Sequence, residues 1–184
     1  MKISKQQAAA NKAALVQAAS RLFREQGLDG TGIAEICQAA GLTQGALYSH
    51  FPTKDALAAE ALAHGQAASN RKMQADLAHG EEGMAAFLDY YLSTEQRDQP
   101  GQHCAMAASA SEIGRQDATI SARFTDCYLE MAQAFKPFLP PGRAQAVVAA
   151  MIGAVAVARA TAKADPALSA QILADMRRWI DEQL

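Results

Sequence analysis

The sequence TGIAEICQAAGLTQGALYSHFPTKDAL occupies residues 31–57 and reads as two short helices joined by a tight turn. Thr31 is placed to cap the first helix, because its hydroxyl can accept a hydrogen bond from a free amide of the next turn. Gly41 stands where a helix ends in a left-handed residue, and Thr43 can cap a second helix only two positions later. Four apolar residues share one face of the first helix: Ile33, Ile36, Cys37 and Ala40. This spacing predicts a helix-turn-helix.

The second helix of the pair is the candidate DNA reader. In a helix-turn-helix the second helix enters a major groove about 12 Å wide, while the first crosses the backbone. Gln44, Gly45 and Ala46 would then face the base edges. From the spacing alone, an ordinary helical hairpin in a bundle explains the pattern equally well.

The residues around the pair favour the DNA-binding alternative. Tyr48, His50, Phe51 and Lys54 follow one another closely at the end of the second helix and the start of the next. With them, the segment from about residue 9 to residue 58 resembles the DNA-binding domain of the TetR family of bacterial repressors. The other residues that carry the resemblance are Ala18, Leu22, Phe23, Gly27, Thr31, Ile36, Ala40, Gly41, Ala46 and Leu47.

The resemblance implies that Tyr48, His50 and Lys54 contact DNA phosphates. A phenol, an imidazole and an ammonium group near a helix N-terminus are donors that fix register on a duplex without reading its sequence. Thr31 and Thr43 would add backbone contacts. Taken alone, a histidine is more often an ordinary surface or core residue. A small core should hold the reader rigid, formed by Leu47 and Phe51 with Leu15, Leu22, Phe23 and Ile36.

Charge is distributed unevenly along the chain. Residues 1–55 carry six Lys or Arg against four acidic side chains, whereas the remainder carries eleven against fifteen. With a net charge of −2, the protein is not a general polyanion binder, so specificity must come from a local surface and from dimerisation. Residues 1–12, with Lys2, Lys5 and Lys12, are interpreted either as a disordered arm for the minor groove or as a solvated tail.

The composition predicts an all-α protein. Its 184 residues are half apolar, rich in Ala, poor in aromatic residues and short of β-branched strand runs. We expect an N-terminal three-helix helix-turn-helix domain over residues 1–55. A larger helical ligand-binding and dimerisation domain should follow over residues 56–184.

The cysteines and the apolar runs favour a cytoplasmic location. Cys37, Cys104 and Cys127 are odd in number and widely spaced, which suits a reducing compartment and gives no paired metal-ligand spacing. The Ala-rich stretch near residues 144–162 is interrupted by Gly153 and flanked by basic side chains. We interpret it as a packed helix rather than a membrane span.

The second half of the chain is expected to be a series of helices separated by loops. The first continues from Lys54 to about Gly80, with Gly65 as a candidate bend, and should link ligand state to reader position. The others are a helix over about 81–96, one beginning near residue 103, one holding residues 124–135, and two over about 143–163 and 166–183.

In TetR-like proteins the equivalent region encloses an inducer cavity, so the resemblance implies a ligand pocket between the middle helices. Their side chains would suit a small, mostly apolar or aromatic molecule with one or two hydrogen-bonding groups. Core packing is the alternative explanation for each residue taken singly. The candidate lining consists of Phe87, Tyr91, His103, Cys104, Met106, Phe124, Cys127, Tyr128 and Met131.

Cys104 has an alternative interpretation as a sensor. It lies near a predicted helix N-terminus and beside His103, and both features lower the pKa of a thiol. A buried, inert cysteine is the other explanation. The segment 102–115 also resembles a subset of TetR-like domains in which a Gly-Cys pair opens this helix, but here His103 replaces the Gly.

The last two predicted helices present more apolar surface than one core needs. A helical hairpin of this kind can pair with its two-fold copy as a four-helix bundle, which is the usual dimer of the family. We therefore expect a homodimer, with Trp179 and Met151 hard to place in a monomer. The candidate interface consists of Val148, Ile152, Gly153, Val155, Ala156, Arg159, Leu168, Ile172, Met176 and Ile180.

The motifs of the common enzyme classes are absent from the sequence. We find no zinc-protease helix, phosphate-binding Gly loop, dinucleotide fingerprint or nucleophile elbow, so neither catalysis nor a cofactor is expected. Glu60, His64 and His79 form only an incomplete ligand set, and no metal site is predicted.

The resemblance therefore implies a homodimeric repressor that binds a palindromic double-stranded DNA operator and is released by a small-molecule inducer. One alternative is a repressor that senses oxidants or electrophiles through Cys104. A less favoured alternative is a helical interaction module without DNA binding.

Overall fold

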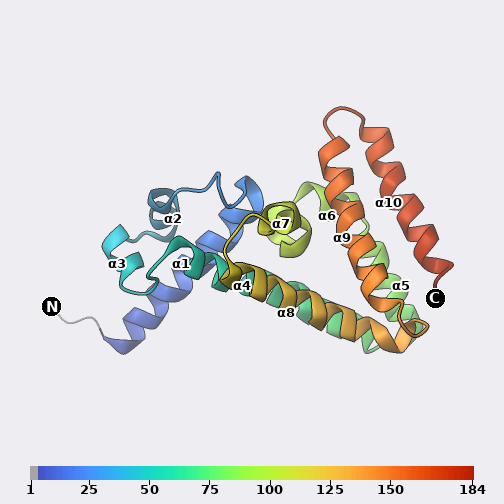
Figure 1. Ribbon diagram of the computed structural model, residues 1–184, viewed down its shortest axis with the longest axis horizontal. Helices are drawn as coiled ribbons and strands as arrows, with labels where there is room; N and C mark the ends of the chain where they lie inside the picture. The colour runs from blue at the N-terminus through green and yellow to red at the C-terminus, as the bar shows by residue number, and fades with distance from the viewer. Residues whose placement is uncertain (1–3) are drawn as a thin grey trace.

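The structure is a computed structural model that describes residues 4–184, and within that range it contains helices and no strand. The N-terminal helices lie at one end of an elongated molecule and the last two helices at the other (Figure 1). The main helices are α1 (Lys5–Gln26), α2 (Ile33–Ala40), α3 (Gln44–Tyr48), α4 (Lys54–Leu77), α5 (Gly80–Tyr91), α6 (Thr94–Asp98), α7 (Ala105–Ile113), α8 (Ala118–Phe135), α9 (Ala144–Thr161) and α10 (Pro166–Asp181). Two 3₁₀ turns are η1 (Pro100–Gln102) and η2 (Lys136–Phe138). The predicted all-α architecture is confirmed.

The turn between α2 and α3 has the predicted geometry. Gly41 adopts a left-handed conformation with φ 67° and ψ 31°, and the Leu42 amide donates to the Cys37 carbonyl at 2.9 Å. Thr43 caps α3, because its hydroxyl accepts from the amide of Ala46 at 3.2 Å.

The start of α2 differs from the prediction. Its N-cap is Gly32, not Thr31, and no side chain caps this helix. The Thr31 hydroxyl instead donates to the Gly27 carbonyl at 2.8 Å, and the residue is only 1% exposed. The Thr31 hydroxyl, which was expected to cap α2, thus binds the backbone of the turn between α1 and α2 instead.

The N-terminal segment is also more ordered than expected. Ser4 accepts a hydrogen bond from the Gln7 amide and caps α1, which begins at Lys5. Lys5 and Lys12 therefore belong to a helix, and the prediction of an arm or tail is wrong for them. Lys2 lies outside the described residues.

A first apolar core holds the helix-turn-helix together. Leu47 and Phe51 are buried in it as predicted, beside Leu15, Leu22, Phe23 and Ile36. The core continues past residue 55, because the first half of α4 contributes residues as far as Leu62. Helices α7 and α8 add Ala105, Ile113 and Ile120.

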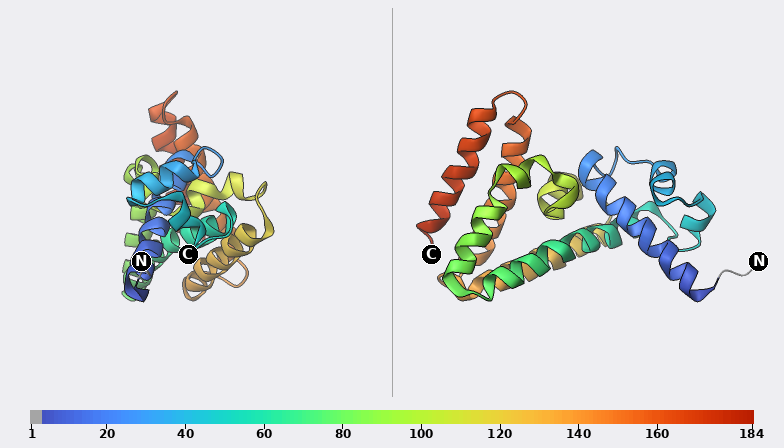
Figure 2. Two further views of the ribbon diagram at one scale, coloured as in Figure 1. Left: turned by 90° about the vertical axis from the view of Figure 1, so that its left-hand side faces the viewer. Right: turned by 180° about the vertical axis from the view of Figure 1, so that it is seen from behind.

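Helix α4 is the long connecting helix that was predicted, and it runs beside α8 along the molecule (Figures 1 and 2). Gly65 was expected as a bend, but α4 is continuous through it. A Cβ added there would lie 2.8 Å from Ser20 Oγ and 3.3 Å from Ala105 Cβ. The glycine is therefore needed where α1, α4 and α7 approach closely.

The helix expected over residues 81–96 is divided. Helix α5 ends at Tyr91, and Ser93 then caps α6 by accepting from the Gln96 amide at 3.1 Å. The N-cap at Ser93 thus begins α6 as a separate helix, and α5 does not extend to residue 96.

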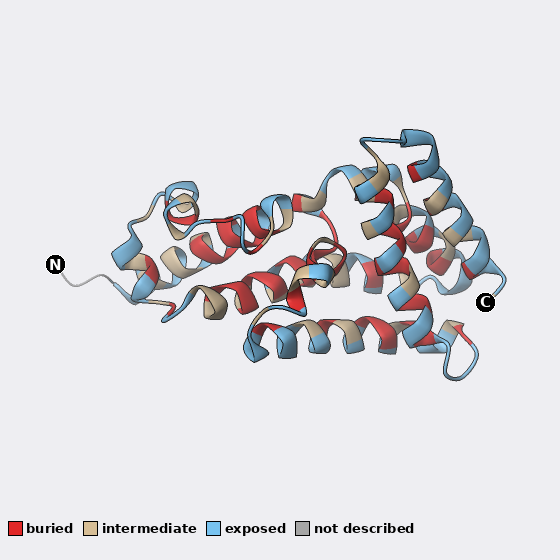
Figure 3. Cartoon of the chain, turned by 45° about the horizontal axis from the view of Figure 1, so that its top comes forward, coloured by how far each residue is buried: buried red, intermediate tan, exposed pale blue. Residues whose placement is uncertain are grey.

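A second apolar core fills the C-terminal part, and the buried residues of the long helices lie where these helices face one another (Figure 3). Asp165 caps α10 by accepting from the Leu168 amide at 2.9 Å, and Pro166 follows at the first helical position, as predicted. Helix α9 is long and apolar enough to cross a membrane, but it packs against α6, α7, α8 and α10.

The close approach at Gly65 makes a testable prediction. Gly65→Val should lower the free energy of unfolding by about 1–3 kcal/mol, because the added methyl groups overpack the junction of α1, α4 and α7. Urea denaturation at one fixed protein concentration would measure this. The control is His64→Ala, an exposed neighbour on the same helix, which should stay within about 0.5 kcal/mol. Equal effects of the two substitutions would contradict the packing argument.

Candidate functional site

Helix α3 exposes the residues predicted to read bases. Thr43, Gln44 and Gly45 are exposed, Ala46 is half-buried, and Leu47 alone among the residues of α3 is buried. The apolar side of the helix is thus anchored in the first core while the other side faces solvent. This is the arrangement that a groove-reading helix requires.

Two of the three predicted phosphate donors are accessible at the end of α3. Tyr48 is 54% exposed, so its phenol hydroxyl is open to a partner. His50 is half-buried, with its ring centroid 6.5 Å from that of Phe51. Ser49 lies exposed between them and was not selected from the sequence. The structure thus groups three polar side chains on one short segment.

The third predicted donor, Lys54, turns inward. Its Nζ donates to the carbonyl oxygen of Leu28 at 2.5 Å and lies 5.9 Å from the centroid of the Phe23 ring. The ammonium group therefore braces the start of α4 against the turn after α1. The buried Thr31 is also unsuited to the DNA-backbone contact predicted for it.

Thr53 adds a feature that the sequence prediction omitted. Its hydroxyl caps α4 by accepting from the Ala56 amide at 3.1 Å, so the first amides of a 24-residue helix lie directly after the candidate reader. Helix N-termini favour phosphate groups. A Pro-Thr pair before an Ala-rich helical run was the available signal, because Thr is a preferred N-cap.

The predicted ligand-lining residues come together in the second core. Phe124 and Tyr128 are half-buried and the other seven are buried. The ring of Phe87 packs 5.7 Å from that of Tyr91 and edge-on to that of Phe135 at 5.8 Å. These side chains pack directly on one another, and the hydroxyl of Tyr128 points to the Gln145 carbonyl at 2.7 Å. The predicted convergence is present, whereas the pocket itself stays a prediction.

Several polar groups lie inside this apolar region with weak partners or none. The buried Tyr91 hydroxyl donates to Cys104 Sγ at 3.2 Å, and that thiol faces Gln66 Oε1 at 3.6 Å. Burial raises the pKa of Tyr91 well above its usual value. His103 Nε2 and Gln96 Oε1 are buried without a hydrogen-bond partner in the described part of the chain. Such groups are costly and uncommon in protein cores.

The prediction that Cys104 has a lowered pKa is wrong. Burial raises the pKa of this thiol, and the opposing hydrogen bonds from Tyr91 and from the amides that open α7 do not offset it. The His103 ring lies 2.7 Å through its Nδ1 from the Tyr90 hydroxyl, and burial lowers its pKa, which disfavours the imidazolium that would activate the thiol. The environment keeps Cys104 a neutral thiol.

The predicted dimer residues divide into two groups. Gly153 and Leu168 are exposed, and Ala156, Ile172 and Met176 are half-buried. Those that are buried within the protomer are Val148, Ile152, Val155 and Ile180, so their assignment to a protein surface is wrong. Met151, which was expected to be hard to place, is buried as well, whereas Trp179 is 40% exposed.

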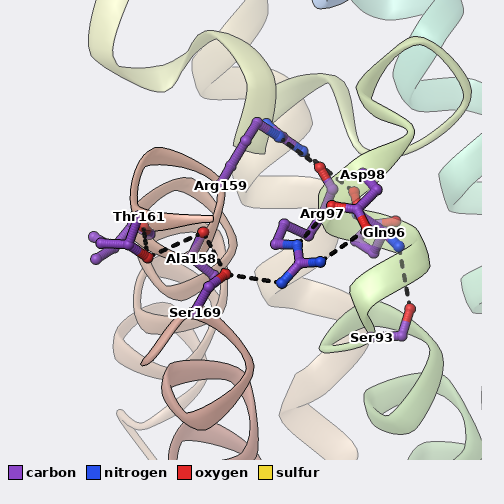
Figure 4. A network of polar contacts seen from close by, with 9 residues as sticks. Ser93, Gln96, Arg97, Asp98, Ala158, Arg159, Thr161 and Ser169 are labelled. Carbon is purple, nitrogen blue, oxygen red and sulfur yellow. Dashed lines mark hydrogen bonds and ion pairs between the residues drawn. The ribbon is translucent and has the colours of Figure 1, made fainter. Parts of the chain in front are cut away.

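Arg159 is used inside the protomer rather than at a dimer surface. Its guanidinium donates to the carbonyls of Arg97, Gln96 and Ala107 at 2.9, 3.2 and 3.2 Å. Arg97 in turn donates to Ser169 Oγ at 2.9 Å, and Ser169 donates to the Ala158 carbonyl at 2.6 Å (Figure 4). This network ties the short helix α6 to α9 and α10.

The described residues contain no group of three His, Cys, Asp or Glu side chains that could hold a metal ion. Glu60 forms an ion pair with Lys12 at 2.8 Å, so it is engaged elsewhere.

The thiols make a further prediction. Burial raises the pKa of Cys37 and Cys104, and that of Cys127 to about 11. Native protein at pH 7 should therefore react slowly with a disulfide reagent at all three positions, with labelling increasing as the pH rises above 9. Mass spectrometry would locate the label, and urea-unfolded protein is the control that should react fast. Rapid labelling of Cys104 in native protein at pH 7 would overturn this description of the thiol.

Comparison with known proteins agrees with this geometry. Residues 15–61 match the family model for bacterial regulatory proteins of the tetR family. The chain is 42% identical over 57 residues to the HTH-type transcriptional regulator AcrR of Shigella flexneri, a match that covers 31% of this chain and 26% of AcrR. It is 47% identical over 49 residues to LmrA of Bacillus subtilis, covering 26% of each chain. These matches therefore span about a quarter of the relatives' length, and the relatives are transcriptional regulators rather than enzymes.

Solved structures extend the similarity of fold to nearly the whole chain. The reduced form of NemR from E. coli superimposes with a TM-score of 0.77 at 18% identity, over 94% of this chain and 96% of that one. A TetR transcriptional regulator from Chloroflexus aurantiacus gives a TM-score of 0.76 at 21% identity, over 97% and 98% of the two chains. Residues 15–61 thus carry the helix-turn-helix sequence of the tetR family of bacterial regulatory proteins, and the whole chain shares its fold with solved TetR regulators.

Proposed function

We propose that this protein is a homodimeric, DNA-binding transcriptional repressor of the cytoplasm that a small molecule releases from a palindromic operator. The observation that carries the proposal is the exposed face of α3, where Gln44 and Gly45 adjoin Tyr48 and His50 on a rigidly packed helix-turn-helix. The match of this segment to the DNA-binding domain of known regulators supports the same assignment.

The two kinds of exposed residue suit two kinds of DNA contact. Tyr48 and His50 present a hydroxyl and an imidazole, which can bind phosphates and set the register of the helix without reading bases, whereas the Ser49 hydroxyl donates to the Ala46 carbonyl at 2.7 Å. Gln44 presents an amide, which can pair with a base edge in the major groove. Because one half-site offers few contacts, two copies of α3 about 34 Å apart would read the two halves of a palindrome.

The underpaired polar groups of the second core support a ligand site in the C-terminal part. Tyr91, Cys104 and Gln66 offer a donor and acceptors whose present partners are weak. A small, mostly apolar molecule with one or two hydrogen-bonding groups would pair with them and with the surrounding rings. Release from DNA needs only a ligand that prefers the DNA-incompatible state, since about 1.4 kcal/mol of differential affinity shifts the equilibrium tenfold.

Dimerisation through α9 and α10 is supported by their exposed apolar surface. Gly153 and Val157 on α9 are exposed, as are Leu168 and Trp179 on α10. Two-fold interfaces between helical hairpins are usually formed by apolar residues on the outer face of each hairpin. Val157 replaces the buried valines of the sequence prediction as a candidate contact.

The dimer proposal predicts that Val157→Glu weakens self-association by more than about tenfold, because a carboxylate would be buried against the apolar surface of the second copy. Sedimentation equilibrium would measure the dissociation constant. Leu129→Glu is the matched control, since Leu129 is an equally exposed apolar residue on α8. The proposed interface fails if both variants stay dimeric or if both dissociate.

DNA binding is tested by fluorescence anisotropy against the DNA upstream of the protein's own gene, with scrambled duplex as competitor, at two salt concentrations. We expect saturable, sequence-selective binding by two protomers per site. Tyr48→Phe should weaken binding to every sequence by about tenfold, because one hydrogen bond to a phosphate is lost. Gln44→Ala should change the preference among operators at one base position by about 1–3 kcal/mol.

Tyr128→Phe is the control for the loss of a hydroxyl, because this phenol lies on α8 and donates to the Gln145 carbonyl. It should leave the affinity for DNA unchanged. Weak, unselective binding of the wild-type protein that disappears with salt would instead favour a helical interaction module. A uniform loss on all sequences for Gln44→Ala would remove that residue from base reading.

A further inference from the structure

The carboxylate of Glu112 joins the C-terminal part of the chain to the helix-turn-helix. The segment from η1 to the end of α7 lies against the end of α1 and the turn after it. Near its start, Arg24 Nη1 donates to the His103 carbonyl at 2.8 Å. Near its end, Glu112 Oε2 accepts a hydrogen bond from the Leu28 amide at 2.7 Å. Helix α7 is therefore held to the DNA-binding part at both of its ends.

The backbone of the α1–α2 turn is shaped to admit this carboxylate. Gly27 has φ 84°, and a Cβ added there would lie 2.4 Å from Glu112 Oε1. A side chain at position 27 would thus be strained by its backbone conformation and would also collide with the carboxylate. Glu112 and Gly27 are 85 positions apart in the sequence. Their contact explains why position 27 has no side chain and why position 112 carries a carboxylate.

Leu28 is held from its other side by Lys54. The Leu28 amide donates to Glu112, while its carbonyl accepts from Lys54 Nζ at 2.5 Å. Lys54 is the first residue of α4 and follows the candidate DNA reader by only a few positions. One residue of the turn therefore connects α7 to the junction between α3 and α4.

The apolar remainder of this junction leaves a small space unfilled. Small side chains such as Ala58, Ala61 and Ala105 border a cavity of about 20 Å³ together with larger ones such as Leu62 and Ile113. The hydroxyl of Ser20, which also lines the cavity, is buried without a partner among the described residues. The directional hydrogen bonds at the two ends of α7 therefore add a constraint on the angle between the two parts that this packing alone does not supply.

We propose that Glu112 is a positioning residue that fixes the orientation of the helix-turn-helix relative to the C-terminal part, with α7 as the element that links this orientation to the ligand region. Helix α7 begins directly after Cys104, the thiol that faces Tyr91 and Gln66, and carries Glu112 one residue before its end at Ile113. A ligand that displaces the start of this short helix moves its far end and the carboxylate with it. The coupling rests on the proposed function, whereas the positioning role does not.

The positioning role is tested without DNA or ligand. Spin labels on Ser49→Cys in the helix-turn-helix and Gln133→Cys on α8 report the distance between the two parts, and both sites are exposed. Labelled protein is diluted with excess unlabelled protein so that pairs within one chain dominate. We expect Glu112→Ala and Glu112→Asp to broaden the distance distribution, because the first lacks the acceptor and the second is too short to reach Leu28.

Glu112→Gln should keep the narrow distribution, since its amide oxygen can accept the same hydrogen bond. Glu82→Ala on α5 is the matched control for the removal of an exposed acidic side chain. Amide exchange of Leu28 is a second readout, which should accelerate about tenfold in Glu112→Ala and Glu112→Asp and stay unchanged in Glu112→Gln. Unchanged distances and exchange in Glu112→Asp would overturn the proposal.

Anisotropy on the upstream DNA then tests the coupling. If the wild-type protein binds and Glu112→Asp alters its affinity by at least threefold while Glu82→Ala does not, the carboxylate acts on the reader. Equal affinities of the wild-type protein and Glu112→Asp for DNA would contradict the proposed coupling between Glu112 and the reader helix. A wild-type protein that binds no DNA would refute the proposed function alone, because the label and exchange measurements would still decide the positioning role.

Discussion

The close packing of α1 on α4 is the constraint on which the rest of the structure depends. Helix α4 contributes to both apolar cores, with Leu57 and Leu62 in the first and Met73 in the second. The helices can approach this closely because Gly65 has no side chain at the point where α7 also arrives. Any change in the angle between α1 and α4 therefore moves the helix-turn-helix relative to the second core, where the ligand site is proposed. The geometry makes these helices the natural route between the two parts.

Features that depend on neighbouring residues were predictable from the sequence. The left-handed Gly41, the caps at Thr43 and Asp165, and the long helix after Lys54 follow from local backbone preferences and from hydrophobic periodicity. The convergence of the aromatic and sulfur-bearing side chains also followed, because residues that share apolar helix faces meet in the core. The family resemblance supplied the DNA-reading role proposed for α3, which periodicity alone left open.

Features that depend on distant partners were not predictable. Apolar periodicity on α9 shows which residues need burial but not which surface buries them, so Val148 and Val155 were assigned to a dimer although the protomer buries them. Lys54 was assigned from the family resemblance and Arg159 from its position on the predicted helix, yet both bind backbone carbonyls that have no signature in the sequence. The sequence left a reactive and a buried Cys104 as alternatives for the same reason, because burial depends on the tertiary fold.

The energies involved explain how such a protein can be regulated without unfolding. The helix-turn-helix shares the first core with α4, α7 and α8, so a small rotation of the unit can leave most of that apolar packing in place. The directional contacts across the junction are few, and each hydrogen bond contributes about 0.5–1.5 kcal/mol, or about 1.5–3 kcal/mol with a charged partner. A tenfold change in DNA affinity requires about 1.4 kcal/mol. The free-energy change from breaking or forming one or two of these contacts is therefore large enough to change DNA affinity tenfold. Disruption of either core would cost far more free energy. A few polar contacts beside the shared apolar core are thus suited to a conformational change confined to the orientation of the reader.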